Sequence, residues 1–310
     1  MGEQSSLRRR HPLLSGCLIL LVVGLLFWAG VSFLLGSLLR SDSSELFGSG
    51  TRKEGVGVIE VRGVISSADQ IVAQLTEFRN QERIKAIVLR IDSPGGAVGA
   101  SQELYSEVQR TNAIKPVVAS MGSVAASGGL YAALGAEKIV ANPGTLTGSI
   151  GVIIKFVNLE ELLEKIGYRT ETIKSGALKD IGAPDRTMSP EERAMLQEMI
   201  SGVHDQFVAA VAASRNLPEE TVREFADGRI FSGTKAREME LIDELGNLND
   251  AALLAAELAG LDPEVVPHLI YPPRRDFSLL ALLLGSKAET RLTSPLNITP
   301  VLAYEWTISP

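Results

Sequence analysis

Cysteine and histidine are scarce in this chain of 310 residues. The single cysteine, Cys17, excludes an intrachain disulfide and any metal site built from cysteines. The three histidines, His11, His204 and His268, leave little material for chemistry that depends on an imidazole. A basic surplus is also missing, because 30 Lys and Arg stand against 37 Asp and Glu, for a net charge of −7. Nucleic acid is therefore not an expected partner.

Disorder of the whole chain is excluded by its composition, since hydrophobic residues make up 45% and charged residues 22%. The length suits one large domain or two small ones. No internal repeat is visible, and no motif indicates a cofactor or a metal, so we expect neither.

The N-terminal region contains a long uncharged run, from Leu13 to Leu39. As a helix it would be about 40 Å long, which exceeds a bilayer core of about 30 Å. Arg8 to Arg10 precede the run and favour a cytoplasmic N-terminus. The apolar run follows Cys17 instead of preceding it, so a lipoprotein cleavage site is disfavoured. We expect residues 1–12 in the cytoplasm and an uncleaved single-pass anchor over 13–39.

We expect the rest of the chain on the periplasmic or extracellular side of the membrane. Residues 40–55 are rich in Ser, Gly and charge and are typical of a linker. We expect one folded domain over 56–272 and a C-terminal tail over 273–310. An apolar run in the tail, Phe277 to Leu284, is too short to cross a bilayer.

Apolar runs alternate with helical patterns along 56–272, which predicts an α/β domain with a mostly parallel sheet. The expected strands are Val56–Ile65, Ile84–Ile91, Pro116–Met121, Lys138–Ala141, Ile150–Phe156 and Tyr168–Ile173. A strong helix start lies at Ser189-Pro190-Glu191-Glu192, where Ser189 can cap and Glu192 can bond back to the cap. This helix is predicted to run to about Arg215.

The segment Met121 to Gly129 follows an expected strand and precedes an expected helix. Small residues surround Ser127, as a nucleophilic serine on a tight turn requires. Backbone N–H groups at a helix start could stabilise an oxyanion there. Close packing of a helix on the sheet would need the same small residues. This segment alone therefore does not distinguish a catalytic turn from a packing contact. Asp92 to Gly96 is a second loop that could bind a ligand. Its glycines have no side chain, so they leave backbone N–H groups accessible.

Several groups could activate a serine. His204 lies within a helical pattern and His268 near prolines, and neither has a motif around it. A lysine can act as the base when desolvation keeps it neutral. Lys174 and Lys179 flank one loop of small residues, and spacing alone does not choose between them.

The motifs together resemble the signal peptide peptidase A family of serine–lysine peptidases, in its short single-domain form. They occur in order over about residues 56–260, at Asp92–Gly96, Ser123–Gly129, Leu146–Gly151, Lys174–Asp180, Asp227–Ala236 and Leu241–Gly246. The resemblance implies a fold like that of the Clp-protease and crotonase superfamily, behind the N-terminal transmembrane helix. It also implies that this helix lies in a bacterial cytoplasmic (inner) membrane. One departure is Leu130, which stands where the family often has an aromatic residue.

The resemblance also implies roles for individual residues. Ser127 would be the nucleophile, Lys179 the base in a crowded apolar pocket, and Ser149 the partner that orients the lysine. Backbone N–H groups of Gly96 and Gly128 would form the oxyanion hole. The family degrades cleaved signal peptides and similar apolar peptides, and it assembles as a homo-oligomeric ring in which neighbouring subunits contribute to each site. We expect small or medium side chains near the cut.

Two other functions remain open at this point. A crotonase-like enzyme acting on an acyl-CoA would use the same glycine loops, but it would need neither the pair Ser127 and Lys179 nor an anchor. A non-catalytic membrane scaffold of the same fold would have lost the chemistry, which the presence of Ser127, Ser149 and Lys179 disfavours.

Overall fold

The computed structural model describes residues 20–33, 53–262, 266–273 and 303–305. The chain divides into two units, Met1–Arg52 and Lys53–Pro310. In the first unit, residues 20–33 form a helix. No helix in the described part of the chain is long and apolar enough to cross a membrane. The remainder of the expected anchor, Cys17 and most of the tail lie outside the described residues.

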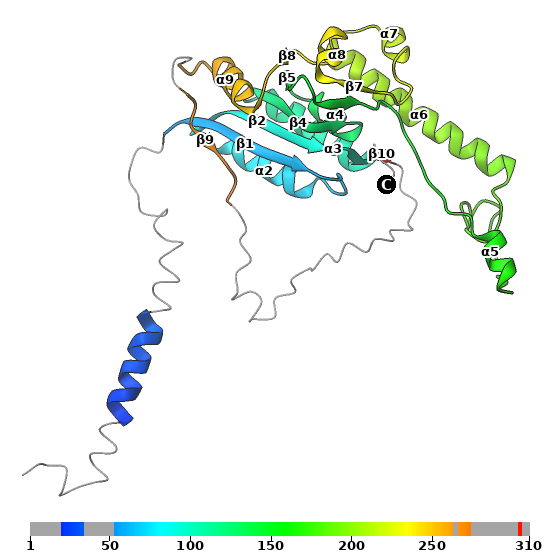
Figure 1. Cartoon of the computed structure of the whole chain (residues 1–310), viewed down its shortest axis with the longest axis horizontal. Helices are drawn as coiled ribbons and strands as arrows, with labels where there is room; N and C mark the ends of the chain where they lie inside the picture. Colours follow the sequence, from blue (N-terminus) through cyan, green and yellow to red (C-terminus); the bar gives the residue numbers. More distant parts are fainter. Residues whose placement is uncertain (1–19, 34–52, 263–265, 274–302, 306–310) are drawn as a thin grey trace, which may run out of the picture. The chain divides into compact units, whose positions relative to one another are not determined.

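A mixed sheet forms the centre of the second unit (Figure 1). Its strand order is β7-β6-β4-β2-β1-β9, and β5 pairs with both β4 and β8. All pairs are parallel except β6 with β7, so the α/β prediction is confirmed. The strands are β1 (Gly55–Arg62), β2 (Ile84–Ser93), β4 (Val117–Ala126), β5 (Lys138–Ala141), β6 (Leu146–Gly148), β7 (Ile230–Ser232), β8 (Glu244–Leu245) and β9 (Leu269–Ile270).

Helices cover both faces of this sheet, because its central strands are apolar on both sides. In β2, Ile87 and Leu89 face a large core with side chains of α2, α3, α4 and α6, whereas Ala86 and Val88 face a second core with α9. The side chains alternate in this way because successive residues of a strand point to opposite faces. These helices are α2 (Asp69–Asn80), α3 (Val98–Asn112), α4 (Gly128–Ala133), α6 (Pro190–Arg215) and α9 (Leu248–Leu258).

The long helix α6 begins and ends as predicted. Ser189 Oγ accepts a hydrogen bond from Glu192 N at 3.2 Å, and Glu192 Oε2 accepts one from Ser189 N at 2.8 Å. This reciprocal pair satisfies backbone donors that a helix start leaves free. Two short helices follow α6, namely α7 (Glu219–Arg223) and α8 (Gly233–Glu238).

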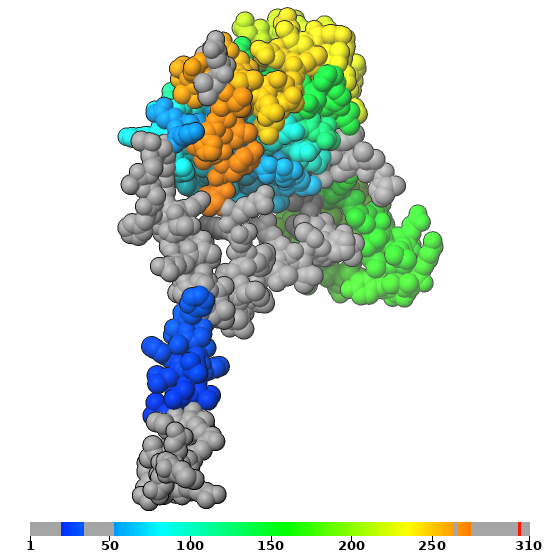
Figure 2. Space-filling view, turned by 60° about the vertical axis from the view of Figure 1, so that its left-hand side comes forward, coloured from blue at the N-terminus to red at the C-terminus, as the bar shows by residue number. Residues whose placement is uncertain are grey.

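Residues 151–189 form an arm between β6 and α6, with one short helix, α5 (Glu160–Lys165). The arm extends away from the sheet and stands out from the surface of the unit (Figures 1 and 2). The predicted strands Ile150–Phe156 and Tyr168–Ile173 are wrong, apart from an isolated bridge at Ile153. Residues 168–173 are exposed, so their β-type composition has no sheet neighbour with which to pair.

A separate two-stranded sheet joins the C-terminal region to the domain. Its strands are β3 (Gly95–Ala97) and β10 (Ala303–Glu305), which pair antiparallel. The sequence predicts no strand in the tail, whereas β10 pairs with β3 of the domain.

Candidate active site

Three parallel strands end at one edge of the sheet. β4 pairs with β2 on one side and with β6 on the other, where Ala125 lies opposite Ser93 and Ala126 opposite Gly148. The residues that follow these strands therefore lie side by side. This register brings the loop that follows Ser93 together with Ser127 and Ser149.

Ser127 occupies the turn between β4 and α4. Its backbone is in the left-handed region, with φ 53° and ψ −116°, which is unusual for a residue with a side chain. Its N–H donates to Gly148 O at 2.8 Å, and its carbonyl accepts from Tyr131 N at 2.8 Å. The backbone is thus held on both sides of the turn.

The Ser127 hydroxyl is buried and has no hydrogen-bond partner within the described residues. The residue is only 1% exposed. A buried hydroxyl without a partner costs free energy, so native structures rarely keep one without a reason. At this turn the hydroxyl is available to a substrate or to a group from outside the chain.

Glycines surround the turn because no larger residue fits. A Cβ atom on Gly128 would collide with Ser101 Oγ and lie 3.2 Å from Gly96 N. A Cβ atom on Gly95, whose φ is +100°, would lie 2.7 Å from Gly128 N. The backbone amides of Gly96 and Gly128 therefore border the same small space. Two such N–H groups can stabilise the charge that develops on a carbonyl oxygen during acyl transfer.

Ser149 follows β6 and lies one strand away from Ser127. Its φ is 51°, and its N–H donates to Arg229 O at 2.8 Å. It is 7% exposed. Ser127 and Ser149 thus occupy equivalent turns, each directly after a residue of the Ala126–Gly148 pair. The structure brings four of the five predicted site residues to one edge of the sheet.

Lys179 is not brought to this edge. It lies on the arm and is exposed, with its backbone N–H donating to Gly176 O at 3.2 Å. Its side chain has no ion pair or hydrogen bond to any other described residue. The crowded pocket that the sequence analysis expects around Lys179 is therefore absent within a single chain, because the arm leaves the body before this residue.

The ammonium group of Lys174, the alternative base, is bound to other residues of the arm. Its Nζ forms an ion pair with Asp180 Oδ1 at 2.6 Å and donates to Ala177 O at 2.9 Å. Arg186 binds the same carboxylate at 2.9 Å and also pairs with Glu192. Hydrogen bonds from Arg186 and Lys174 hold the pKa of Asp180 well below its usual range. This network fixes the residue that follows Lys179.

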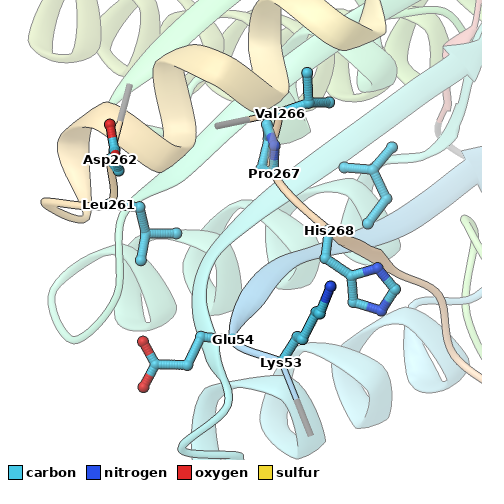
Figure 3. Close-up of a pocket in the computed structure, with 8 residues that line it drawn as sticks. Lys53, Glu54, Leu261, Asp262, Val266, Pro267 and His268 are labelled. Carbon is cyan, nitrogen blue, oxygen red and sulfur yellow. The ribbon is translucent and has the colours of Figure 1, made fainter. Parts of the chain in front are cut away.

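The two histidines of the described region contact other parts of the domain. His204 is on α6, where its Nε2 lies 2.7 Å from Ala226 O. His268 lines a cavity of about 500 Å³ beside Lys53 and Pro267 (Figure 3). Its carbonyl accepts from Val56 N at 2.9 Å, at the amino end of β1 and hence at the opposite edge of the sheet. Neither histidine forms a hydrogen bond with Ser127 Oγ, which has no partner within the described residues.

Three aromatic residues near the site were missed by the sequence analysis. Tyr131 on α4 and Phe207 on α6 pack against Tyr304 on β10. The apolar run that ends in Tyr304 is a signal for a strand. Its partner β3 lies about two hundred residues earlier in the chain, and a local sequence pattern does not identify a partner at that distance. Leu130, which stands where the family often has an aromatic residue, is fully buried in the core. The described residues hold no cluster of His, Cys, Asp or Glu suited to a metal ion.

Comparison with known proteins places this geometry in a class. The Clp protease family matches residues 59–145, which include the turn at Ser127, and the fold is a Clp-protease-like α/β fold. The family described as peptidase family S49 matches residues 109–262.

Individual proteins are also similar to this chain. A protein of Synechocystis sp. that bears the name of a protease, slr0021, is 49% identical over 71% of this chain and 79% of its own length. An Enterococcus faecium protein named for signal peptide peptidase SppA is 35% identical over 67% of this chain and 65% of its own length. A ClpP1 mutant from Listeria monocytogenes shares 16% identity and a TM-score of 0.44, over 63% of this chain and 94% of its own.

The chain belongs to peptidase family S49 and is a peptidase similar to signal peptide peptidase A.

Proposed function

We propose that this chain is a membrane-anchored serine endopeptidase whose nucleophile is Ser127 and whose general base is Lys179. The observation that carries the proposal is the buried, unpartnered hydroxyl of Ser127 beside the amides of Gly96 and Gly128. A nucleophile, two convergent N–H donors and a constrained turn are the parts that acyl transfer needs.

In the proposed reaction, Ser127 Oγ attacks the carbonyl carbon of an extended peptide as its proton passes to the Lys179 amine. The N–H groups of Gly96 and Gly128 donate to the oxygen on which negative charge develops. The lysine then protonates the leaving nitrogen, and water hydrolyses the ester of Ser127. Ser149, on the neighbouring turn, orients the lysine amine.

Lys179 has to come from a second copy of the chain in this proposal. The exposed arm supports this, because it carries Lys179 away from the sheet edge of its own chain (Figure 1). A homo-oligomeric ring would place each arm against the Ser127 turn of a neighbour. The base would then become buried on assembly, and desolvation would keep its amine neutral.

Complementation between copies tests this arrangement. Ser127→Ala and Lys179→Ala should each be inactive, but mixed rings should recover part of the activity, because some sites combine an intact serine with an intact lysine. Mixing Ser127→Ala with wild type supplies the assembly control. No recovery in rings shown to exchange subunits would contradict the shared site.

A fluorophosphonate reagent tests the nucleophile directly. The wild type should be labelled at Ser127, whereas Ser127→Ala should not be labelled. Labelling that persists in this variant would assign the chemistry to another residue.

The substrates we propose are cleaved signal peptides and similar apolar peptides, which membranes release close to an anchored enzyme. The uncharged run over 13–39 supports a single-pass anchor, and Arg8 to Arg10 support a cytoplasmic N-terminus. Protease added to spheroplasts should then digest the body of the chain. A fully protected body would show the opposite orientation.

A further inference from the structure

The strand β4 carries a bulge shortly before the turn of the candidate nucleophile. Ile91 of β2 lies opposite Met121 of β4. Two residues later on β2, Ser93 lies opposite Ala125, which is four residues later on β4. Three residues of β4, 122–124, therefore lie opposite a single residue of β2. Bulges of this kind occur next to active sites, where they change the direction in which the following residues point.

Two buried threonines hold the bulge from the side of β6. Thr145 Oγ1 donates to Gly122 O at 2.7 Å, at the start of the bulge. Thr147 Oγ1 donates to Ala125 O at 2.7 Å, at its end. Both threonines are almost completely inaccessible to solvent. Their hydrogen bonds to β4 therefore form in a low-dielectric surrounding, where they are electrostatically stronger than in water.

The carboxylate of Asp92 holds the bulge from the side of β2. Its Oδ1 accepts a hydrogen bond from Val124 N at 3.1 Å. The carboxyl group also lies against Gly122, where a Cβ atom would be 2.9 Å from Asp92 Cγ. Side chains on both sides thus fix the backbone of the bulge.

The bond from Thr147 also links the two strand ends that lead to the predicted serines. Ala125 lies two residues before Ser127, and Thr147 lies two residues before Ser149. The backbone of Ser127 is in a sparsely populated conformation, with φ 53° and ψ −116°. Such a conformation persists only when the surrounding structure determines it. The bonds of the bulge supply this constraint immediately before the turn.

We propose that Thr147 and Asp92 are positioning residues, which place Ser127 Oγ against the amides of Gly96 and Gly128. This inference rests on the proposed function. Both side chains act through backbone groups of β4 and not on the substrate. Loss of either bond lets the bulge shift and moves the hydroxyl relative to the oxyanion donors. A misplacement of about 1 Å can lower the rate of an enzyme by about 10²-fold.

Removal of the threonine hydroxyl is the first test, made on the full chain in detergent with an apolar reporter peptide. Thr147→Val keeps nearly the same shape, and its kcat should fall about 10²-fold while KM changes by less than about threefold. Thr147→Ser restores the donor and should recover most of the kcat. Thr111→Val is the matched control, because Thr111 is equally buried and its Oγ1 accepts from Arg79 Nη1 at 3.2 Å. This control should keep its kcat even where its melting temperature falls.

The rate of labelling by a fluorophosphonate is a second readout, since this reagent reacts with Ser127 without a peptide leaving group. The labelling rate of Thr147→Val should fall together with its kcat. A wild type that hydrolyses the peptide, beside a Thr147→Val variant that keeps both rates, would overturn the positioning role of Thr147. A loss that Thr111→Val shares, or that Thr147→Ser does not reverse, would also overturn it.

Asp92 is tested by comparing two substitutions. Asp92→Ala should lower kcat about tenfold, because nothing then accepts the hydrogen bond from Val124 N at this position. Asp92→Asn keeps an oxygen acceptor and should stay close to the wild type. Equal losses in the two variants would show that a charge is required, which would overturn the positioning role of Asp92.

Two further outcomes separate this proposal from the proposed function. If Thr147→Val does not fold, the comparison of Asp92→Ala with Asp92→Asn decides whether the bulge positions the nucleophile. A wild type that neither hydrolyses peptides nor reacts with the fluorophosphonate would instead refute the proposed function, and the positioning roles with it.

Discussion

The sheet edge and the arm carry the two halves of the proposed dyad, and they differ in how they are held. At the edge, Ser127 is bound on both sides by backbone hydrogen bonds, and a Cβ atom added to Gly95 or Gly96 would collide with other backbone atoms. On the arm, a Cβ atom added to Gly176 would touch nothing within 4 Å, and Lys179 is exposed. One chain therefore holds the residues of the sheet edge in place by itself, whereas it provides no surroundings for Lys179 on the arm.

In the proposed mechanism, this difference gives one half of the site its final geometry before any assembly with a second copy. An oxyanion hole works only when its donors are fixed before the reaction, which the crowded glycine turns achieve. A lysine base has the opposite requirement, since it must lose contact with water, and the isolated arm does not remove it from water. Completing the second half by contact with a neighbour would also keep an unassembled chain inactive.

The largest expected effect is at the edge. Ser127→Ala should lower the turnover of an apolar reporter peptide by about 10⁴-fold or more, because it removes the attacking oxygen. The far-UV spectrum should not change, since one unpartnered oxygen is lost from a turn that backbone bonds define. Ser123→Ala, at an exposed position of the same strand, is the control and should stay active. Retained turnover in Ser127→Ala would refute the nucleophile.

The next effect is on the arm, where two lysines can be compared directly. Lys179→Ala should lose about 10³-fold in turnover, as expected for the loss of a general base. Lys174→Ala should keep most of the activity, because its ammonium group is already bound to Asp180. An active Lys179→Ala beside an inactive Lys174→Ala would reverse the assignment.

The sequence alone predicts the edge better than the arm. Strand–turn–helix motifs at Ser127 and Gly96 are local, so composition and spacing reveal them, and the capping box of α6 is local in the same sense. The predicted strand Tyr168–Ile173 failed because β propensity needs a neighbouring strand, and the arm provides none.

Contacts distant along the chain were beyond the reach of the sequence analysis. The pairing of β10 with β3 joins segments about two hundred residues apart, and no local pattern in the tail indicates its partner. The sequence also does not predict that Lys179 is exposed. Its motif is local, but the path of the arm depends on where the chain leaves β6 and where α6 begins.

One substitution made in both regions sharpens the comparison. Gly128→Ala should lower turnover by about 10²-fold, because its Cβ atom would press on Ser101 and displace an oxyanion donor. Gly176→Ala should leave turnover near that of the wild type, since open space surrounds this position. Reporter peptide kinetics on both variants measure the difference, and similar losses in the two would show that the arm is as constrained as the edge.

The smallest expected effect concerns how acid acts on the two regions. A hydrogen bond from Arg186 is the main cause that lowers the pKa of Glu192 from its ordinary 4.5 to about 2. Because the folded-state pKa is depressed, the stabilisation is present above pH 4.5 and is lost as the pH falls toward 2. Hydrogen exchange over 180–192 should therefore become faster across this window, after correction for the intrinsic rate. The amides of Ser127 and Ser149 bond to backbone carbonyls and should show no such change.

Glu192→Gln should remove this pH dependence, and Glu198→Gln, at an exposed position of the same helix, should not. The junction of arm and helix would then be held by a charge network, whereas the sheet edge is held by the backbone. A pH response that Glu192→Gln leaves unchanged would assign it to another group. A response of equal size at Ser127 would show that acid loosens the whole domain and not the arm in particular.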